Sequence, residues 1–234
     1  PLWAGILMLP LTAGFLLAGP VSGYLSDHIG ARYLATGGMT GAATGFLLLL
    51  LLPVDFAYWG FGAILLFVGL SMGAFSAPNR AAIMNSLPAR HRGAGGGMNS
   101  TFQTSAQVLS IGVFFTLMIV GLSATLPTTL TQGLLAHGVP LSVATHVGNL
   151  PPVSILFAAF LGYNPIQTLV GPTVLAHLSV ANRSALTGHA FFPDLIAPPF
   201  HAGLTAAFIF AATVSLIAAA ASWSRGSRYV SADL

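Results

Sequence analysis

The sequence predicts an all-α integral membrane protein with five membrane-spanning helices and one long connecting segment. Of its 234 residues, 55% are hydrophobic and only 5% are charged, whereas an ordinary soluble domain is about 25% charged. The mean hydropathy is +0.86. Five stretches also reach the length of about 20 apolar residues that a helix needs to cross a bilayer core. These observations argue against a soluble enzyme, a nucleic-acid-binding protein and a disordered chain.

The five predicted spans contain no acidic side chain. They cover residues 2–23, 33–52, 56–84, 98–122 and 201–223. Between the last two spans, the apolar run Val153–Leu161 is too short to cross a membrane, and it is followed by Gly162 and Pro165. We therefore expect the segment of residues 123–200 to contain, at this run, a re-entrant or interfacial hairpin that packs on the helical bundle.

The second span carries glycines at a spacing of four residues, Gly37, Gly41 and Gly45. In lipid, such a row of small residues lets two helix backbones approach closely. We interpret this row as a packing surface and not as a binding site.

The arginines predict the orientation of the spans. If the loop after the first span is cytoplasmic, six of the seven arginines lie on the cytoplasmic side: Arg32, Arg80, Arg90, Arg92, Arg225 and Arg228. The opposite orientation would place only Arg183 there, so the positive-inside rule favours the first arrangement. The prediction is a multi-pass protein of the plasma membrane (in a bacterium, the inner membrane) whose C-terminus is cytoplasmic and whose residues 123–200 are extracytoplasmic.

No cofactor, metal site or nucleic-acid partner is predicted. The chain has no cysteine, and its seven basic residues are too few to form a phosphate-binding patch. Several histidines gather in the extracytoplasmic segment, but their spacing fits no metal-binding motif; they are His137, His146, His177, His189 and His201. We expect them to be unstructured surface side chains. Catalytic constellations at membrane depth are also absent from the sequence, so an enzyme is not predicted.

The loop after the first span has the pattern G-x-L-x-D-x-x-G-x-R, with Gly23, Asp27, Gly30 and Arg32 at its fixed positions. The glycines allow a tight turn between antiparallel helices. Asp27 can accept backbone N–H bonds at a helix start, and Arg32 can pair with a carboxylate or cap a carbonyl end. This bundle of features is more than a chance cytoplasmic turn would carry.

The pattern resembles the loop signature of the major facilitator superfamily. Further stretches resemble the fourteen-helix drug:proton antiporter branch of that superfamily, including members with a long outer hairpin before the last helix. These stretches are Gly69–Gly73, Pro78, Pro88–Gly95, Leu156–Pro165, Phe191–Pro193 and Ala221–Gly226.

The resemblance implies an architecture for the whole chain. Residues 1–122 would be transmembrane helices 8–11 of a twelve-helix core, residues 123–200 the outer segment with its hairpin, and residues 201–234 the last span and a cytoplasmic tail. The N-terminal half would precede this C-terminal part. Gly23, Asp27, Gly30 and Arg32 would form a cytoplasmic conformational switch that holds one half against the other.

The fourth span carries the candidate substrate site. Asn99, Gln103 and Gln107 recur every four residues and therefore share one face of the helix. Such polar groups are disfavoured against lipid, so they either line a cavity or form hydrogen bonds between helices, and the sequence leaves both open. Phe114 on the same helix, with Met72 and Phe75 on the third span, would supply an apolar wall.

The function implied by the resemblance is secondary active transport by alternating access. We expect the C-terminal part of a proton-coupled exporter of lipophilic or cationic drugs, with a small molecule, protons and the lipid bilayer as partners. No acid lies within a predicted span, so the N-terminal half would supply the proton-coupling group. The alternatives are a transporter of another small solute and a non-transporting membrane sensor or scaffold.

Overall fold

The computed structural model describes residues 2–53, 56–188 and 190–225. Arg228 and His189, which the sequence analysis assigned to a cytoplasmic and an extracytoplasmic position, lie outside the described residues. The described part of the chain is helical and contains no strand. The helices are α1 (Leu2–Leu7), α2 (Leu9–Ile29), α3 (Ala31–Leu50), α4 (Tyr58–Asn85), the 3-10 turn η1 (Ala89–His91), α5 (Arg92–Ala136), α6 (Leu141–Gly148), α7 (Pro152–Phe160), α8 (Ile166–Val170), α9 (Pro172–His177), α10 (Val180–Thr187) and α11 (Phe191–Trp223).

Five helical segments are long and apolar enough to cross a membrane, as the sequence predicts. They are Gly5–Ile29, Ala31–Leu50, Tyr58–Asn85, Ala89–Ala136 and Phe191–Trp223. The all-helical fold and the number of spans are therefore confirmed, and the chain is a multi-pass membrane protein. The last two segments extend past the expected ends at Leu122 and His201.

The chain divides into two compact units. Unit 1 comprises residues 1–109 and 208–234, and unit 2 comprises residues 110–207, so the division falls within α5 and α11. The boundaries that the sequence predicts at residues 122 and 200 are ends of membrane spans and not limits of compact units, and they stay predictions. Past Leu122 an apolar period continues, with leucines at every fourth position through Leu134.

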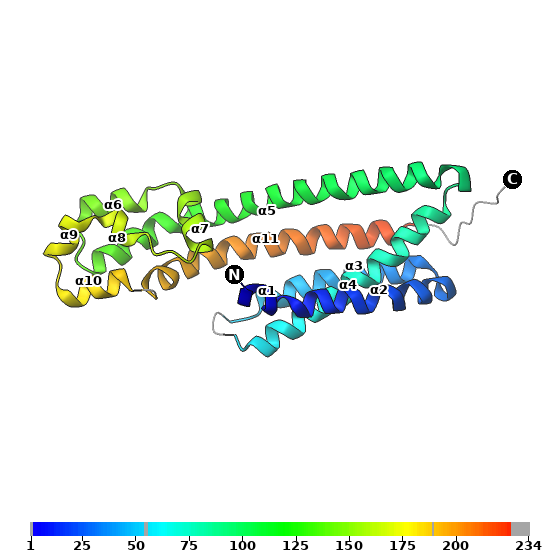
Figure 1. The fold of residues 1–234 in the computed structure, drawn as a ribbon, viewed down its shortest axis with the longest axis horizontal. Coiled ribbons are helices and arrows are strands. Elements are labelled where there is room, and N and C mark those ends of the chain that lie inside the picture. The colour runs from blue at the N-terminus through cyan, green and yellow to red at the C-terminus, as the bar shows by residue number, and fades with distance from the viewer. Residues whose placement is uncertain (1, 54–55, 189, 226–234) are drawn as a thin grey trace. The chain divides into compact units, whose positions relative to one another are not determined.

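In unit 1, α4 packs against both α2 and α3 (Figure 1). The contacts are close because glycines face backbone atoms: a methyl group at Gly69 would overlap the carbonyl oxygen of Leu11, and one at Gly73 would lie 2.6 Å from the carbonyl oxygen of Phe15. Close approach of this kind is typical of helix packing in lipid. A buried hydrogen bond from Ser22 Oγ to the carbonyl oxygen of Gly73, 3.1 Å long, also joins α2 to α4.

One member of the glycine row of α3 differs from the expected one. Gly37 has open space around it, whereas a methyl group at Gly38 would lie 2.6 Å from the carbonyl oxygen of Ser71 on α4. Gly41 and Gly45 do face α4, toward Ser71 and Val68. Gly38 joins them because residues three and seven positions apart share a helix face. The sequence showed the packing surface but misjudged one of its members.

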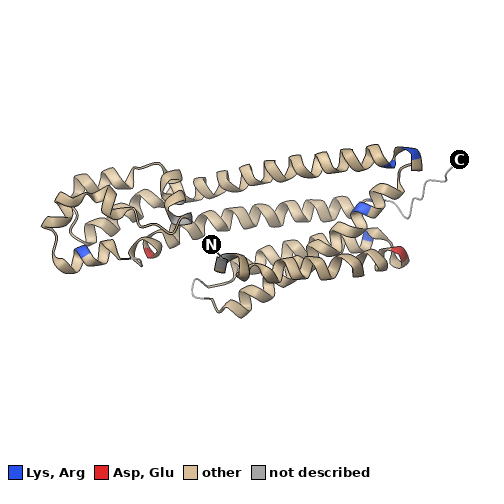
Figure 2. Ribbon diagram, in the orientation of Figure 1, with Lys and Arg blue, Asp and Glu red and all other residues tan. Residues whose placement is uncertain are grey.

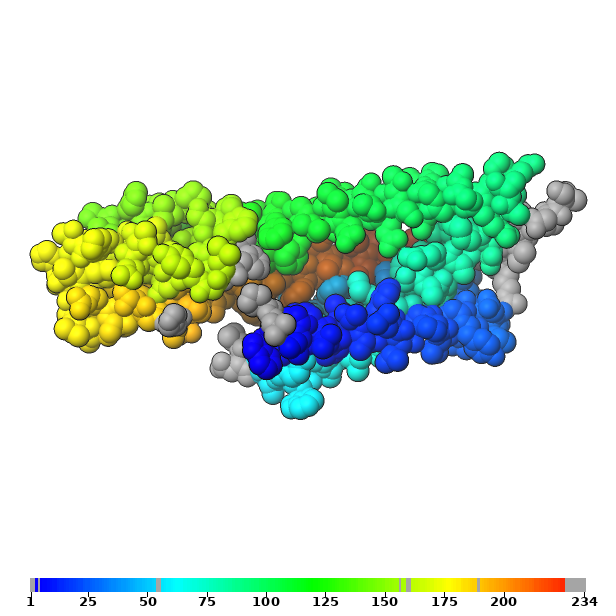
Figure 3. All heavy atoms as spheres, viewed as in Figure 1, coloured from blue at the N-terminus to red at the C-terminus, as the bar shows by residue number. Residues whose placement is uncertain are grey.

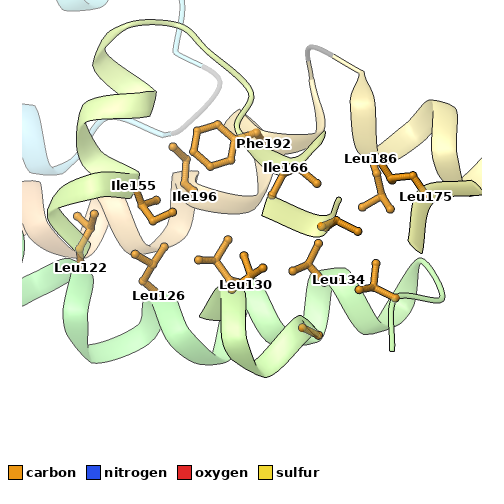
Figure 4. Close-up of a cluster of buried hydrophobic side chains, with 14 of the residues drawn as sticks. Leu122, Leu126, Leu130, Leu134, Ile155, Ile166, Leu175, Leu186, Phe192 and Ile196 are labelled. Atoms are coloured by element: carbon orange, nitrogen blue, oxygen red, sulfur yellow. The ribbon is translucent and has the colours of Figure 1, made fainter. Parts of the chain in front are cut away.

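Unit 2 has a core of large apolar side chains. Leucines 122, 126, 130 and 134 form one stripe along α5 and meet side chains from the short helices and from α11, including Ile155, Ile166 and Phe192 (Figure 4). In the space-filling view, the atoms of α6 and α8–α10 pack into one continuous mass (Figure 3).

The described part of residues 123–200 thus belongs to a helical unit with several short elements, and the re-entrant or interfacial position of the expected hairpin stays a prediction. The stretch Val153–Leu161 contributes the single helix α7 to this unit. The physical reason for the several short elements is the leucine stripe of α5, whose burial requires several covering helices.

The described histidines of unit 2 also differ from the expectation, because His146, His177 and His201 lie on helices and His137 directly follows one. His137 Nδ1 lies 2.9 Å from the carbonyl oxygen of Gly133, and its ring packs edge-on against Phe191 with centroids 4.9 Å apart. His177 Nδ1 lies 2.7 Å from the carbonyl oxygen of Thr173. Among the described residues, no three histidine or acidic side chains gather into a possible metal site.

Candidate functional site

A cavity of about 300 Å³ lies between α4 and the first part of α5, within unit 1. Its volume is at the lower end of the range for small-molecule sites. The residues that line it are Phe75, Ser76, Asn79 and Arg80 of α4, with Asn99, Phe102 and Gln103 of α5.

Helical periodicity brings these side chains to one place. On α4, Phe75 and Asn79 are four residues apart, as are Ser76 and Arg80, so two adjacent rows of the helix face the cavity. On α5, Asn99 and Gln103 have the same spacing. The facing surfaces therefore combine two aromatic rings with a cluster of amides, one hydroxyl and one guanidinium.

Arg80 is the one charged residue among the described side chains that line the cavity. Its Nη2 donates a long hydrogen bond, 3.5 Å, to Gln103 Oε1. A guanidinium has five N–H donors, so Arg80 can hold Gln103 and still donate to a bound acceptor. Next to it, the buried Oδ1 of Asn79 has no hydrogen-bond partner in the described part of the chain. The cavity thus offers donors and an unsatisfied acceptor to a polar group between aromatic walls.

The cavity occupies the half of α4 nearest its C-terminal end. With a rise of about 1.5 Å per residue, Arg80 is about 8 Å and Phe75 about 15 Å from Asn85 along the helix axis. Asn85 is the last residue of α4. In the predicted orientation this end of α4 is cytoplasmic.

Three of the six predicted substrate-site residues meet in the cavity: Phe75, Asn99 and Gln103. Gln107 continues the polar row one turn further along α5 but is exposed and is not part of the described wall. Met72 is also outside the wall, and Phe114 belongs to unit 2.

Sequence reasoning missed Ser76, Asn79, Arg80 and Phe102, four of the residues in the cavity wall. The signal was present on the third span, where polar residues recur in its last turns at helical spacing. From the sequence, Arg80 was used only as one of the arginines that predict the orientation of the spans. Because intramembrane ionisable residues usually face a cavity, it deserved the same weight as the amides.

The predicted switch loop is a tight connection between α2 and α3. Gly30 joins the two helices with φ of +92°, a conformation that glycine adopts at no steric cost. Asp27 is exposed in the last turn of α2. Gly23 lies one turn before it and receives a hydrogen bond at its carbonyl oxygen from Ser26 Oγ, 2.8 Å long.

Arg32 makes a different contact from the carboxylate or carbonyl that the sequence suggested. Its Cζ lies 4.2 Å from the ring centroid of Trp223 at the end of α11. The neighbouring Tyr33 packs edge-on against the same indole, with centroids 5.8 Å apart. Within unit 1, the start of α3 is therefore held to the end of α11 by a cation–π and an aromatic contact.

The charged residues of unit 1 gather at one end of its helices, the end that carries this loop (Figure 2). The opposite end carries none among the described residues. Such an asymmetry is typical of a membrane bundle with a positively charged cytoplasmic side.

Unit 1 therefore has the characteristics of a polytopic helical membrane bundle with a partly polar cavity between its helices. Residues 1–111 match the family model of the Major Facilitator Superfamily. This stretch, slightly less than half of the chain, is similar to members of that superfamily.

Two kinds of relatives are similar to the chain. The methyl viologen resistance protein SmvA of Salmonella typhimurium is 29% identical over 126 residues, which are 54% of this chain and 26% of the relative. The riboflavin transporter RibZ of Clostridioides difficile is 29% identical over 114 residues, which are 49% of this chain and 25% of the relative. The matched part thus spans about a quarter of the length of each relative. No solved structure matches the chain significantly.

Proposed function

We propose that the chain is the C-terminal part of a proton-coupled exporter of lipophilic compounds that works by alternating access. Residues 1–122 and 201–234 would supply helices 8–12 of its twelve-helix core, and residues 123–200 an extracytoplasmic segment. The superfamily match over residues 1–111 supports a transporter rather than an enzyme. The similarity to a resistance protein supports export. In the spans of the structure, Asp27 and Asp194 lie only near span ends, so we propose that the proton-coupling group belongs to another part of the transporter.

The observation that carries the proposal is the cavity between α4 and α5. Two aromatic side chains beside five polar ones suit a site for lipophilic solutes that also carry a hydrogen-bonding group. Of the two substrate classes expected from the sequence, the cavity favours neutral lipophilic compounds that carry an acceptor group. A cation would be repelled by Arg80. The Coulomb repulsion between two unit charges in close contact near a protein surface is on the order of a few kcal/mol.

The test is a competition export assay on the full-length protein in cells, normalised to the amount of folded protein in the membrane. Gln103→Ala and Arg80→Gln should change the order of exported substrates more than they change protein abundance. Arg80→Gln should also improve export of cationic substrates relative to neutral ones. Gln107→Ala is the matched control, since it removes the same side chain one turn away from the described wall.

Two outcomes would contradict this proposal. An unchanged substrate order in both cavity variants would remove the cavity from the transport path. A general loss of folded protein without a change in selectivity would instead assign these side chains to hydrogen bonding between helices, the alternative left open by the sequence.

A second candidate function is the transport of another small solute, such as a vitamin or metabolite. The similarity to a riboflavin transporter favours it. The same assay separates the two candidates: a solute carrier would show one preferred substrate that competes out all others, whereas an exporter of lipophilic compounds would show several weak competitors. A membrane sensor or scaffold would show no export in either case.

The loop around Asp27 is proposed to act as the conformational switch. Asp27→Asn should lower transport severalfold and leave expression nearly unchanged, because the loss of an exposed carboxylate shifts a conformational equilibrium without unfolding a helix. Asp194→Asn in unit 2 is the matched control. Transport at the wild-type rate in Asp27→Asn would exclude the switch role.

The proposed orientation is tested by cysteine labelling in intact cells, since the chain itself has no cysteine. Ser184→Cys, exposed on α10, should react with an impermeant thiol reagent. Ser86→Cys, exposed after α4, should react only after the membrane is opened. Labelling of Ser86→Cys in intact cells would overturn the orientation.

A further inference from the structure

Unit 2 has very little charge for a unit with its own core. Between residues 110 and 207, the charged side chains are Arg183 and Asp194. A domain surrounded by water is about 25% charged. Much of the surface of unit 2 is therefore unsuited to water, although its interior is already filled by a buried apolar core.

Helix α7 presents the clearest apolar surface of this unit. Val153, Phe157 and Leu161 are 39%, 59% and 80% exposed, and they recur every four residues. Leu161 continues the helical turn, because its N–H donates to the carbonyl oxygen of Phe157 at 3.0 Å. On the other side of the helix, Ile155 is only 1% exposed and belongs to the core. We call Val153, Phe157 and Leu161 the α7 stripe.

An amphipathic aromatic side chain, Tyr163, follows the α7 stripe. Tyr163 is half-exposed, and its hydroxyl pairs with Thr168 Oγ1 at 2.9 Å. Tyrosine is enriched where a membrane meets water, because its side chain is amphipathic. The α7 stripe and Tyr163 therefore match the two parts of an interfacial anchor, which are an apolar face and an adjacent aromatic side chain.

Helix α10 of the same unit has the opposite character. It contains Asn182, Arg183 and Ser184, and Ser179 caps its start by accepting a hydrogen bond from the N–H of Asn182 at 3.2 Å. The two helices show that unit 2 has a surface fit for water and a surface that is not.

A lipid surface is the occupant that fits the α7 stripe. Both chain ends of unit 2 continue into α5 and α11, each of which contains a candidate membrane span, so the unit is tethered to the bilayer at two points. The stripe itself consists of three apolar side chains without charge or hydrogen-bonding group, which matches the chemistry of acyl chains. An apolar helix face of this kind sinks about 5–10 Å into the boundary between head groups and acyl chains.

We infer that the α7 stripe inserts into the membrane interface and anchors unit 2 to the bilayer that α5 and α11 cross. This inference concerns the attachment of unit 2 and does not depend on which solute the protein transports. It assigns to the exposed Phe157 a role that packing within the chain does not explain.

The test uses the full-length protein, with any cysteines elsewhere replaced by serine, in vesicles of phosphatidylcholine and phosphatidylglycerol. A nitroxide spin label is attached to Phe157→Cys, and its collision rates with oxygen and with a water-soluble nickel chelate are compared. Val180→Cys on α10 is the matched control, because Val180 is also apolar and is 76% exposed.

The label at 157 should collide severalfold more with oxygen than with nickel, relative to the label at 180. Leu161→Cys at the end of the stripe should give the same result, and it guards against a local packing defect at 157. Equal nickel accessibility at 157 and 180 would overturn the inference. Low collision rates with both reagents would also overturn it, because they would mean that a protein surface covers the stripe.

Discussion

Unit 1 and unit 2 are stabilised by different kinds of contact. Unit 1 buries mostly small residues, such as Ala35, Ala42 and Ala43, and brings helix backbones together at glycines. Unit 2 buries large side chains, and its fully buried residues include a phenylalanine, a methionine and four leucines of α5. Helices in lipid gain no hydrophobic free energy from burying leucine, because lipid acyl chains are as apolar as leucine. They therefore associate by close packing. A core of large side chains indicates stabilisation by removal from water.

The difference between the two cores bears on how the exposed apolar side chains of each unit are interpreted. The exposed large side chains of unit 1, among them Leu16, Leu17 and Val21 on α2, are normal for a surface in contact with lipid. The same exposure on the α7 stripe is abnormal for a unit that has already formed a hydrophobic core. The comparison predicts that equivalent substitutions have unequal costs in the two units.

The largest expected effect is on the core of unit 2. Leu130→Ala removes a fully buried side chain from the leucine stripe of α5 and should lower the free energy of unfolding of unit 2 by about 2–5 kcal/mol. The control Leu16→Ala trims an exposed side chain of unit 1 and should change stability by no more than about 0.5 kcal/mol. Amide hydrogen exchange of the full-length protein in lipid nanodiscs measures both. Equal costs at the two sites would refute the distinction between the units.

The next effect concerns the backbone contact of unit 1. A methyl group at Gly69 would overlap the carbonyl oxygen of Leu11, so Gly69→Ala must push α2 and α4 apart. We expect a loss of about 1–3 kcal/mol, as for other overpacked sites. Gly37→Ala is the control, because nothing lies within 4 Å of the added methyl group, and higher helix propensity should make it neutral or slightly stabilising. Unfolding in detergent micelles distinguishes the two. If Gly69→Ala proves as stable as Gly37→Ala, close packing does not hold unit 1 together.

The sequence predicted best the features that depend on hydrophobicity alone. The five spans follow from long apolar runs, and the structure confirms them. The small-residue row of α3 was also visible, except that Gly38 and not Gly37 faces α4. A one-residue shift lies within the width of a helix face, so spacing alone does not separate these neighbours.

The sequence predicted least where distant segments meet. Helices α6–α10 of unit 2 are short, and each contributes a side chain to the core that contains the leucine stripe of α5. Most of them lie far from this stripe along the chain. In the cavity, Asn99 and Gln103 were predictable because an amide row in a span is unusual. Their partner Arg80 belongs to another helix, and only the packing of α4 near α5 brings it to Gln103. The contact of Arg32 with Trp223 was unpredictable for the same reason.

The smallest expected effect sharpens the account of unit 1, since it tests a contact that is neither small-residue packing nor a hydrophobic core. Trp223 is half-exposed beneath the guanidinium of Arg32, and exposed cation–π pairs contribute about 0.5–1 kcal/mol. A double-mutant cycle of Arg32→Gln and Trp223→Leu in full-length protein isolates this term from the loss of the indole surface. Both single variants should lose stability, and the double variant should lose less than their sum by about 0.5–1 kcal/mol. Strict additivity would mean that the two side chains are only neighbours. In that case the start of α3 would be held to α11 by Tyr33 and by the buried contacts of Met39 and Ala42 with Ala219.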